Sequence, residues 1–247
     1  MKPVCMVIGA GAGIGGHVAK RFASEGYHVV LCRRSDAQGL ASMVEQIRHD
    51  GGSATGFLLD AAAPDAIEIR IAQVEADIGP IEVMLYNLGA QIGNRPLENT
   101  SYKAFELGWR LGTFGLFRAA SVLCPLMEAR NKGVILVTSA TSAVRGNAGQ
   151  HSHAAAMGGR RMLCQSLNAQ YASKGIHVVH VLIDGAVDAP DTLGKMLGAE
   201  AFQQLRDRLL LPEKIAETYF HLAQQHRSAW THELDLRAYS DLAWWNH

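Results

Sequence analysis

Short apolar runs alternate with longer amphipathic stretches along most of the chain. The apolar runs are rich in aliphatic and β-branched residues, which predicts strands at residues 4–8, 28–32, 54–59, 83–86, 134–138, 177–183 and 232–237. Between these runs apolar residues recur at helical spacing, which predicts helices at about 14–25, 36–49, 64–78, 101–128, 152–173 and 198–225. Pro212 lies inside the last stretch and is expected to break it.

The order of these predicted elements indicates the fold class. Strand–helix–strand units form parallel sheets with right-handed crossovers and with helices on both faces. Nearly continuous apolar strands fit a sheet that is buried on both sides. We therefore expect an α/β protein of the Rossmann type, with a doubly wound, mostly parallel seven-stranded sheet, in which residues 1–247 form a single domain. Ligands of such sheets bind at the carboxyl ends of the strands.

The composition argues against several classes of function. The 23 basic and 23 acidic side chains balance, so no net charge draws the chain to nucleic acid or to an anionic membrane. No apolar run is long enough to span a bilayer, and the first residues lack the pattern of a secretory signal. The four cysteines are far apart and mostly inside apolar runs, which predicts buried free thiols and a cytoplasmic protein.

A glycine-rich turn joins the first predicted strand to the first predicted helix. The segment "VIGAGAGIGG" contains Gly9, Gly11, Gly13 and Gly15, with Ile14 among them. Glycine allows positive φ and a close approach of a ligand to the backbone. The amino end of the following helix offers free N–H groups and partial positive charge to a pyrophosphate. In this position the turn predicts a dinucleotide site, the alternative being a glycine turn that binds nothing.

Two arginines follow the second predicted strand in "VVLCRRSD". An NAD-selective site of this kind has a carboxylate here, which binds the ribose 2′-hydroxyl. This chain has Arg33 and Arg34 instead, and a guanidinium binds a 2′-phosphate through two hydrogen bonds. The sequence therefore predicts a preference for NADP(H) over NAD(H). The alternative is a pair of solvated surface arginines.

These motifs together resemble the short-chain dehydrogenase/reductase family along nearly the whole chain. "GAGAGIG", "YNLGA" and "KGIHVVHVLIDGAVDAP" match the family's glycine turn, its fourth-strand motif and its sixth strand with the following loop. The resemblance implies that the dinucleotide is also contacted by residues that follow the later strands, namely Asp60, Ala61, Asn87, Leu88, Gly89 and Val187.

The same resemblance puts other residues at all four of the family's catalytic positions. The family has Asn, Ser, Tyr and Lys there, whereas this chain has Gly112, Ala140, His153 and Met157. Activity is therefore not implied by the resemblance alone. His153 is the candidate catalytic residue, because an imidazole titrates near pH 6.5 and exchanges a proton with an alcohol or a carbonyl without a neighbouring cation. The alternative is a polar residue left at an abandoned site.

Several neighbouring groups could complete such a site. Asp184, in the loop after the sixth strand, could orient the imidazole. Ser139 should point away from the site if its strand extends that far, so Thr141 or Ser142 would have to replace the lost serine hydroxyl. The segment "HSH" alone has too few ligands for a metal, and no metal site is predicted.

Glycines punctuate the fourth predicted helix in "LGWRLGTFGLF". Gly108, Gly112 and Gly115 each weaken a helix by about 1 kcal/mol relative to alanine, and a close helix–helix approach would compensate. In the family this helix pairs with a second subunit, which implies a homodimer or homotetramer. Close packing within one subunit is the alternative.

Three functions remain open at this point. The first is an NADP(H)-dependent oxidoreductase of an unknown carbonyl or alcohol substrate, with His153 at the tyrosine position. The second is a catalytically silent dinucleotide-binding protein or partner subunit. The third is a lyase or isomerase that uses His153 without hydride transfer. The motifs for the dinucleotide fit all three, and nicotinamide redox chemistry favours the first.

Overall fold

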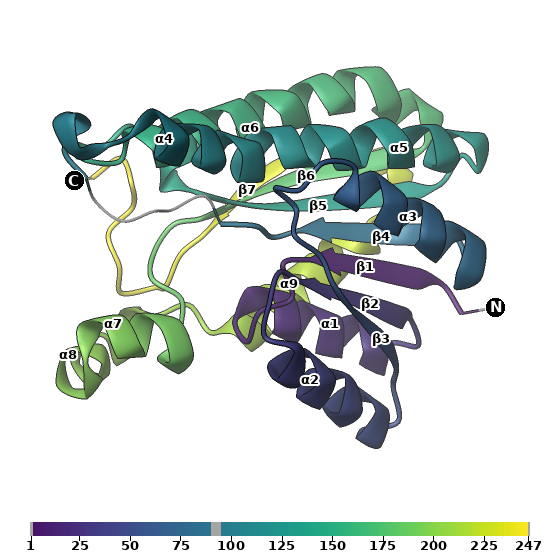
Figure 1. The fold of residues 1–247 in the computed structure, drawn as a ribbon, viewed down its shortest axis with the longest axis horizontal. Coiled ribbons are helices and arrows are strands. Elements are labelled where there is room, and N and C mark those ends of the chain that lie inside the picture. The colour runs from purple at the N-terminus through teal and green to yellow at the C-terminus, as the bar shows by residue number, and fades with distance from the viewer. Residues whose placement is uncertain (1, 90–94, 247) are drawn as a thin grey trace.

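The structure is a computed structural model that describes residues 2–89 and 95–246. Its centre is one parallel sheet in the order β3-β2-β1-β4-β5-β6-β7 (Figure 1). The strands are β1 Val4–Ile8, β2 His28–Arg33, β3 Ser53–Leu58, β4 Ile81–Tyr86, β5 Gly133–Ala140, β6 Ile176–Ile183 and β7 Glu233–Leu236. The predicted fold class and all seven predicted strands are therefore confirmed.

Helices cover both faces of this sheet (Figure 1). They are α1 Ile14–Ser24, α2 Ala37–His49, α3 Ala66–Asp77, α4 Tyr102–Trp109, α5 Gly115–Ala129, α6 His151–Tyr171, α7 Lys195–Leu197, α8 Ala199–Gln204 and α9 Pro212–Ala223. Alternate side chains of each central strand point to opposite faces. One core lies between the sheet and α1, α2 and α9, and the other lies under α3, α5 and α6.

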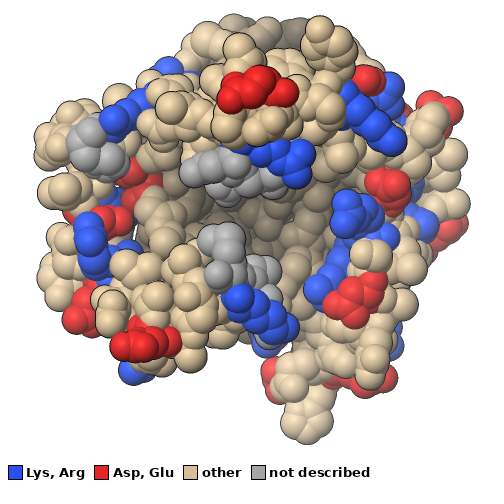
Figure 2. Space-filling model, turned by 60° about the vertical axis from the view of Figure 1, so that its left-hand side comes forward, with Lys and Arg blue, Asp and Glu red and all other residues tan. Residues whose placement is uncertain are grey.

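The carboxyl ends of the strands open onto a hollowed face of the molecule. Figure 2 shows this face with Lys and Arg side chains around its central hollow. The connections β1–α1, β2–α2 and β3–α3 all leave the sheet at this edge, as parallel strands require. The fold therefore gathers the predicted ligand-binding segments on one side.

Two predicted helices are divided in the structure. The stretch predicted as one helix from 101 to 128 is interrupted by a π-helical turn at Arg110–Phe114, between α4 and α5. The stretch at 198–225 becomes α8 and α9, and Pro212 starts α9 rather than interrupting a helix. Proline fits the first turn because its missing N–H has no partner there.

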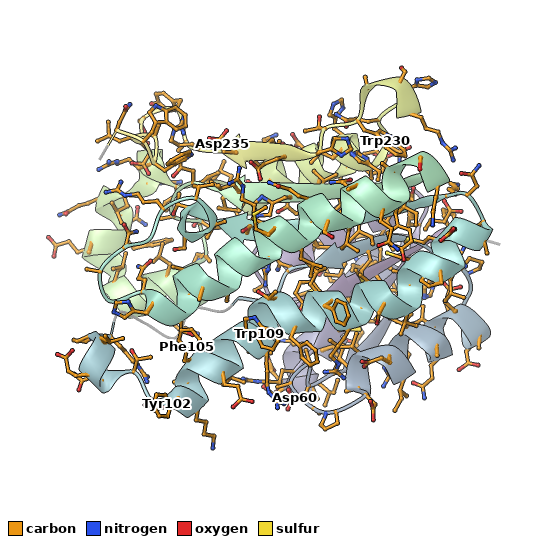
Figure 3. The ribbon with its side chains drawn as sticks, turned by 90° about the horizontal axis from the view of Figure 1, so that it is seen from above. Asp60, Tyr102, Phe105, Trp109, Trp230 and Asp235 are labelled. Atoms are coloured by element: carbon orange, nitrogen blue, oxygen red, sulfur yellow. The ribbon has the colours of Figure 1, made fainter. Side chains whose placement is uncertain are left out.

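Aromatic side chains lie on the outside of α4 and α5. Tyr102, Phe105 and Trp109 follow one another along α4 (Figure 3), with 96%, 41% and 42% of their surface exposed. Phe114 stacks between Trp109 and Phe117, with ring centroids 5.2 and 6.3 Å apart. We call Tyr102, Phe105, Trp109 and Phe117 the aromatic surface.

Two further predictions concern the cysteines and membrane-spanning segments. Cys5, Cys32, Cys124 and Cys164 are all buried free thiols, as predicted. Within residues 2–89 and 95–246, no helix is both long and apolar enough to cross a membrane.

Candidate functional site

A cavity of about 600 Å³ lies at the carboxyl edge of the sheet. Its lining comes from the glycine turn, the end of β2, the end of β4 and the segment after β6, and includes Gly11, Gly13, Ile14, Gly15, Arg33, Asp36, Asn87, Val187, Ala189 and Lys195. The structure therefore brings together, around one cavity, those lining residues that the sequence predicts to contact the dinucleotide. Asp36 and Lys195 are charged residues of the lining that the sequence analysis missed.

The glycine turn is shaped by contacts with the end of β4. Gly9 has φ of +100°, and a Cβ atom on it would lie 2.7 Å from the backbone oxygen of Asn87. The side-chain amide of Asn87 donates a hydrogen bond to the Gly9 oxygen over 3.0 Å. A Cβ at Gly15 would collide with the same Gly9 oxygen, whereas one at Gly11 would meet only open space. The turn is thus packed against β4 on one side and open to the cavity on the other.

Arg33 is the last residue of β2 and Arg34 follows it, and of the two only Arg33 lines the cavity. Its Nη2 lies 2.8 Å from Oδ2 of Asp36, while Arg34 is exposed and outside the lining. Asp36 also accepts a hydrogen bond from the Gly39 N–H at the start of α2, and its φ is +64°. A phosphate that binds Arg33 would therefore compete with the Asp36 carboxylate. An Asp that caps a helix is visible in the sequence, but its contact with Arg33 is not.

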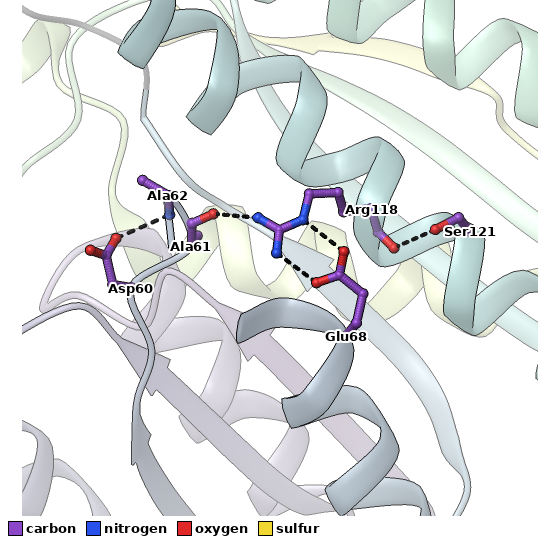
Figure 4. Close-up of polar contacts among 6 residues, drawn as sticks. All are labelled: Asp60, Ala61, Ala62, Glu68, Arg118 and Ser121. Atoms are coloured by element: carbon purple, nitrogen blue, oxygen red, sulfur yellow. Dashed lines mark hydrogen bonds and ion pairs between the residues drawn. The ribbon is translucent and has the colours of Figure 1, made fainter. Parts of the chain in front are cut away.

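Asp60 and Ala61 lie on the loop that leads from β3 to α3. The Asp60 carboxylate accepts a hydrogen bond from the Ala62 N–H, and the Ala61 oxygen accepts one from Arg118 on α5 (Figure 4). Arg118 also donates two hydrogen bonds to Glu68, at 2.7 and 2.6 Å, which lowers the pKa of Glu68. The loop is held by α5, and neither Asp60 nor Ala61 belongs to the cavity lining.

The three residues after β4 have separate roles in the structure. Asn87 contacts the glycine turn as described, while the Leu88 oxygen accepts a hydrogen bond from Arg160 at 2.8 Å. Gly89 is exposed, and a Cβ atom on it would meet no atom of the described residues within 4 Å. Val187, in the loop after β6, lines the cavity and pairs with Leu210. Leu88 and Gly89 lie outside the lining.

Comparison with known proteins decides the family. Residues 3–193 match the short chain dehydrogenase family. The chain belongs to this family. A short-chain dehydrogenase from Rhodopseudomonas palustris shares its fold with a TM-score of 0.81 and 32% identity, over 96% of this chain and 99% of that one. The family is one of oxidoreductases, and its fold accounts for the arrangement of β1, the glycine turn and α1.

Two further relatives have more specific names. The short-chain reductase protein NovJ from Streptomyces niveus is 29% identical over 90% of this chain and 87% of its own length. An actinorhodin polyketide ketoreductase, solved with NADPH, has a TM-score of 0.86 at 23% identity, with 96% of each chain covered. At that identity the second likeness concerns the fold alone.

The resemblance to short-chain dehydrogenases assigns His153 and Met157 to the tyrosine and lysine positions. Both lie in the first two turns of α6. His153 is half-buried, and its Nδ1 is buried with no hydrogen-bond partner among the described residues. Its pKa is lowered by burial first and by Arg160 second. Met157 is buried in a small apolar cluster with Ala156, Ala140 and Ala143. His153 lies outside the lining of the cavity.

The hydroxyl groups near Ala140 are arranged differently from our expectation. β5 extends to Ala140, yet the Ser139 Oγ lies 3.8 Å from the sulfur of Met157, so Ser139 does reach this part of α6. The Ser142 hydroxyl donates to the side-chain oxygen of Gln150 over 3.2 Å. Thr141 is half-buried in the turn that follows β5.

Asp184 is engaged away from His153. Its carboxylate accepts a hydrogen bond from Arg237 at 2.8 Å and one from the Trp244 N–H at 3.1 Å, and 3% of its surface is exposed. The suggestion that Asp184 orients the imidazole is therefore not supported by these contacts. Asp184 instead ties the end of β6 to the C-terminal segment.

Arg160 is the charged residue of α6 that the sequence analysis missed. It is fully buried beneath the carboxyl ends of β4 and β5. The sequence indicates Arg160 only through its spacing. It comes three positions after Met157 and seven after His153, so the three residues share one face of a helix. In the part of the chain that the structure describes, no three His, Cys, Asp or Glu side chains gather as a metal site would require.

Proposed function

We propose that the protein is an oxidoreductase that interconverts an alcohol and a carbonyl on a small molecule and uses NADP(H) in preference to NAD(H). The observation that carries this proposal is the position of Arg33 on the cavity, beside the glycine turn. A guanidinium at the end of β2 suits a 2′-phosphate, whereas a carboxylate would suit a free 2′-hydroxyl.

The residues of the cavity fit a dinucleotide. Gly11 faces open space where a Cβ would intrude on a ligand, and the amino end of α1 follows directly, as pyrophosphate binding requires. The cavity volume of about 600 Å³ is in the range of cofactor sites. Lys195 adds a second cation to the lining. A bound nicotinamide would supply the hydride acceptor or donor.

His153 is the group we assign to proton transfer. In the oxidation of an alcohol, the carbon gives up hydride while the neutral imidazole takes the hydroxyl proton, and in reduction an imidazolium returns the proton. Burial and the nearby Arg160 lower the pKa of His153, so the imidazole is neutral at pH 7. We therefore expect the inflection in the rate of reduction to lie below the ordinary histidine pKa of about 6.5.

Names of relatives agree with this proposal. NovJ is a short-chain reductase, and three neighbours were solved with NADP or NADPH, among them a gluconate 5-dehydrogenase from Burkholderia cenocepacia and a metagenomic short-chain oxidoreductase.

Thermal-shift titration with NADPH and NADH tests the choice of cofactor. We expect NADPH to raise the melting temperature more than NADH at equal concentration. Arg33→Ala should narrow the difference, whereas Arg34→Ala, which removes the same charge outside the cavity, should change it less. Equal shifts with both cofactors in the unaltered protein would contradict the proposal.

A second candidate is a catalytically silent dinucleotide-binding protein or partner subunit. It is favoured by the apolar cluster around Met157, which occupies the end of the site where chemistry would occur. The two functions differ in one outcome, because a silent protein binds NADPH but gives no turnover with any alcohol or carbonyl. A lyase or isomerase that uses His153 would give turnover without a change in nicotinamide absorbance.

We also propose that the protein forms a homodimer or homotetramer through the aromatic surface on α4 and α5. Exposed contiguous aromatic side chains on a soluble protein mark interaction surfaces. At Gly115 the contacts favour the alternative of close packing within one subunit, because a Cβ there would collide with the hydroxyl of Tyr86. The aromatic surface, not that glycine, therefore supports the assembly.

A further inference from the structure

Arg160 is the largest fully buried side chain of the protein among the residues described, with 1% of its surface exposed. Its guanidinium donates hydrogen bonds to three backbone oxygens from three different elements. The Gly112 oxygen lies in the π-helical turn at 2.7 Å, the Leu88 oxygen follows β4 at 2.8 Å, and the Thr138 oxygen lies on β5. One cation thus joins three segments at the carboxyl edge of the sheet.

A buried arginine of this kind is costly unless its charge is stabilised. Charged side chains are almost never fully buried without a partner. In the described ranges the ion pairs of the protein include no carboxylate for Arg160. Its charge is balanced by carbonyl dipoles and by the ring of Tyr86, whose centroid is 5.3 Å away. Since a guanidinium stays protonated in proteins, the site contains a fixed positive charge.

Helix geometry places Arg160 and His153 on one face of α6. Residues seven apart lie two turns apart on one face of a helix, at about 3.6 residues per turn. Side chains of a helix lean toward its amino end, which directs the long side chain of Arg160 toward the preceding turn of α6, where Met157 lies. The Thr138 oxygen that binds Arg160 and the Ser139 hydroxyl that contacts Met157 are on adjacent residues of β5. The guanidinium and the Met157 side chain therefore reach the same end of that strand.

We propose that Arg160 is a positioning residue that holds His153 in its uncharged form, so that the imidazole acts as a proton acceptor. This inference rests on the proposed function in assigning proton transfer to His153. A fixed cation disfavours a second positive charge nearby. The repulsion adds to burial in lowering the pKa of His153. At neutral pH the site is then prepared to take the proton of an alcohol and poorly prepared to give one to a carbonyl.

The other charged groups near α6 do not replace this effect. On α4, Arg110 and Glu106 pair with each other over 2.8 Å and are exposed. On β6, His180 is buried beside Glu233 and has its pKa lowered to about 4, so it is neutral at pH 7. Tyr86 on β4 and Tyr219 on α9 have raised pKa values because they are buried. Arg160 is the charge that, after burial, lowers the pKa of His153.

Titration of His153 by NMR tests the proposal directly. The chain has 11 histidines, and His153→Gln identifies the signal to be followed. The titration midpoint of His153 should lie below 6.5 and should rise by about 0.5–1 pH unit in Arg160→Met. Arg160→Lys is the matched control, because it keeps the charge while losing part of the hydrogen bonding. Its midpoint should stay low even if its melting temperature falls as far as that of Arg160→Met.

The opposite outcome would overturn the proposal. If the midpoint is the same in the unaltered protein and in Arg160→Met, or rises equally in both variants, Arg160 has only a structural role. Should Arg160→Met fail to fold, Met157→Lys provides the second measurement. A lysine there adds a cation beside the guanidinium, so the midpoint should fall further. A midpoint that does not fall would contradict an electrostatic role for this helix face.

Activity separates this inference from the proposed function. The rate of alcohol oxidation should rise with pH to a plateau, with an inflection that matches the midpoint of His153 and moves upward in Arg160→Met. If no alcohol turns over, the proposed function fails while the titration still decides the role of Arg160. If turnover occurs but its inflection does not follow the midpoint, the assignment of His153 as the acceptor fails.

Discussion

Arg33 and Asp36 form an ion pair, and a change at Asp36 alone should alter the preference for NADPH over NADH. The Asp36 carboxylate lies 2.8 Å from the guanidinium that we expect to bind the 2′-phosphate. Asp36→Asn removes this competing charge, and Asn preserves the helix cap and tolerates the positive φ at this position. We expect the variant to bind NADPH about two- to fivefold more tightly, with little change for NADH, since an exposed ion pair has a small energy.

Isothermal titration at low salt measures this change. Glu45→Gln is the control, because Glu45 is an exposed acid on the same helix α2 outside the cavity lining, and it should leave both affinities unchanged. An equal gain in affinity for NADPH and for NADH in Asp36→Asn would indicate that Arg33 does not contact the 2′-phosphate.

At this scale the sequence predicted those residues whose role depends on local chain geometry. The glycine turn was predictable because positive φ and close packing at Gly9 and Gly15 follow from the turn itself. Arg160 was not, because its role arises from hydrogen bonds to residues 48, 22 and 72 positions away in the chain. Asp36 was missed although its contacts with Arg33 and Gly39 each span only three positions. Nothing in "GGRRML" distinguishes buried Arg160 from its half-buried neighbour Arg161, which pairs with Glu233 across 72 positions of the chain.

Among the elements, the junction between α4 and α5 is the most constrained. The Tyr86 hydroxyl donates a hydrogen bond to the Leu111 oxygen over 2.6 Å in the π-helical turn, and it fills the space beside Gly115. We expect Gly115→Ala to lower the free energy of unfolding by about 1–3 kcal/mol through overpacking, despite the better helix propensity of alanine. Denaturant unfolding measures this.

Tyr86→Phe supplies the matching test of that contact. Removing the hydroxyl loses the bond to Leu111, at a cost of about 1 kcal/mol, but makes room for the new methyl group. The double variant should therefore be more stable than the sum of the two single effects. Strict additivity would show that the Tyr86 hydroxyl is not what excludes a side chain at Gly115.

The aromatic surface gives a second prediction about these helices. Phe117→Glu puts a charge beside the stacked rings of Phe114 and Trp109, and this charge would be buried in the proposed interface. Light scattering should show a shift toward monomer at micromolar concentration. Ile69→Glu is the control, because Ile69 on α3 is similarly exposed, at 54% against 52% for Phe117. An unchanged mass in Phe117→Glu would exclude this surface as the interface.

Element type was predictable where one face of a segment is apolar, and boundaries were less so. The periodicity of 101–128 has no signal for the π-helical turn at Arg110–Phe114. That turn depends on Arg160, which binds the Gly112 oxygen, and on Thr113, whose hydroxyl binds the Ala156 oxygen at 2.6 Å. Both are tertiary contacts with α6, so a local pattern could not predict them.

At the scale of the whole molecule, alternating strands and helices were sufficient to predict the sheet. Its parallel order follows from short right-handed crossovers, and the burial of both faces follows from apolar strands such as β6. Whether the catalytic end of the site is active could not be predicted in the same way. It depends on how His153 is desolvated and charged, which is a property of the assembled fold.

Stability of the whole protein should fall in mild acid. His153, His177 and His180 have folded-state pKa values below 6.5. From pH 6.5 down to the folded-state pKa of each histidine, the unfolded chain therefore binds more protons than the folded one. Their contribution to stability is therefore present above pH 6.5 and is lost as pH falls. Glu68 and Glu233 have lowered pKa values too, and their contributions are lost at lower pH.

His180→Gln checks the largest of these effects. Burial lowers the pKa of His180 to about 4, so its protonation on unfolding accounts for about 2–3 kcal/mol of the loss between pH 6.5 and 4. Denaturant unfolding should show a smaller fall across this range in the variant. The same fall in both proteins would indicate that His180 does not resist protonation in the folded state.

The most direct test of the proposed function is turnover in the direction of oxidation. The protein is mixed at neutral pH with NADP⁺ and a panel of primary and secondary alcohols, and the nicotinamide absorbance is followed. We expect at least one alcohol to be oxidised, faster with NADP⁺ than with NAD⁺, and we expect His153→Gln to lose about 10²–10⁴-fold in kcat while still binding NADPH. Full turnover in His153→Gln, or tight NADPH binding without any turnover in the unaltered protein, would contradict the account.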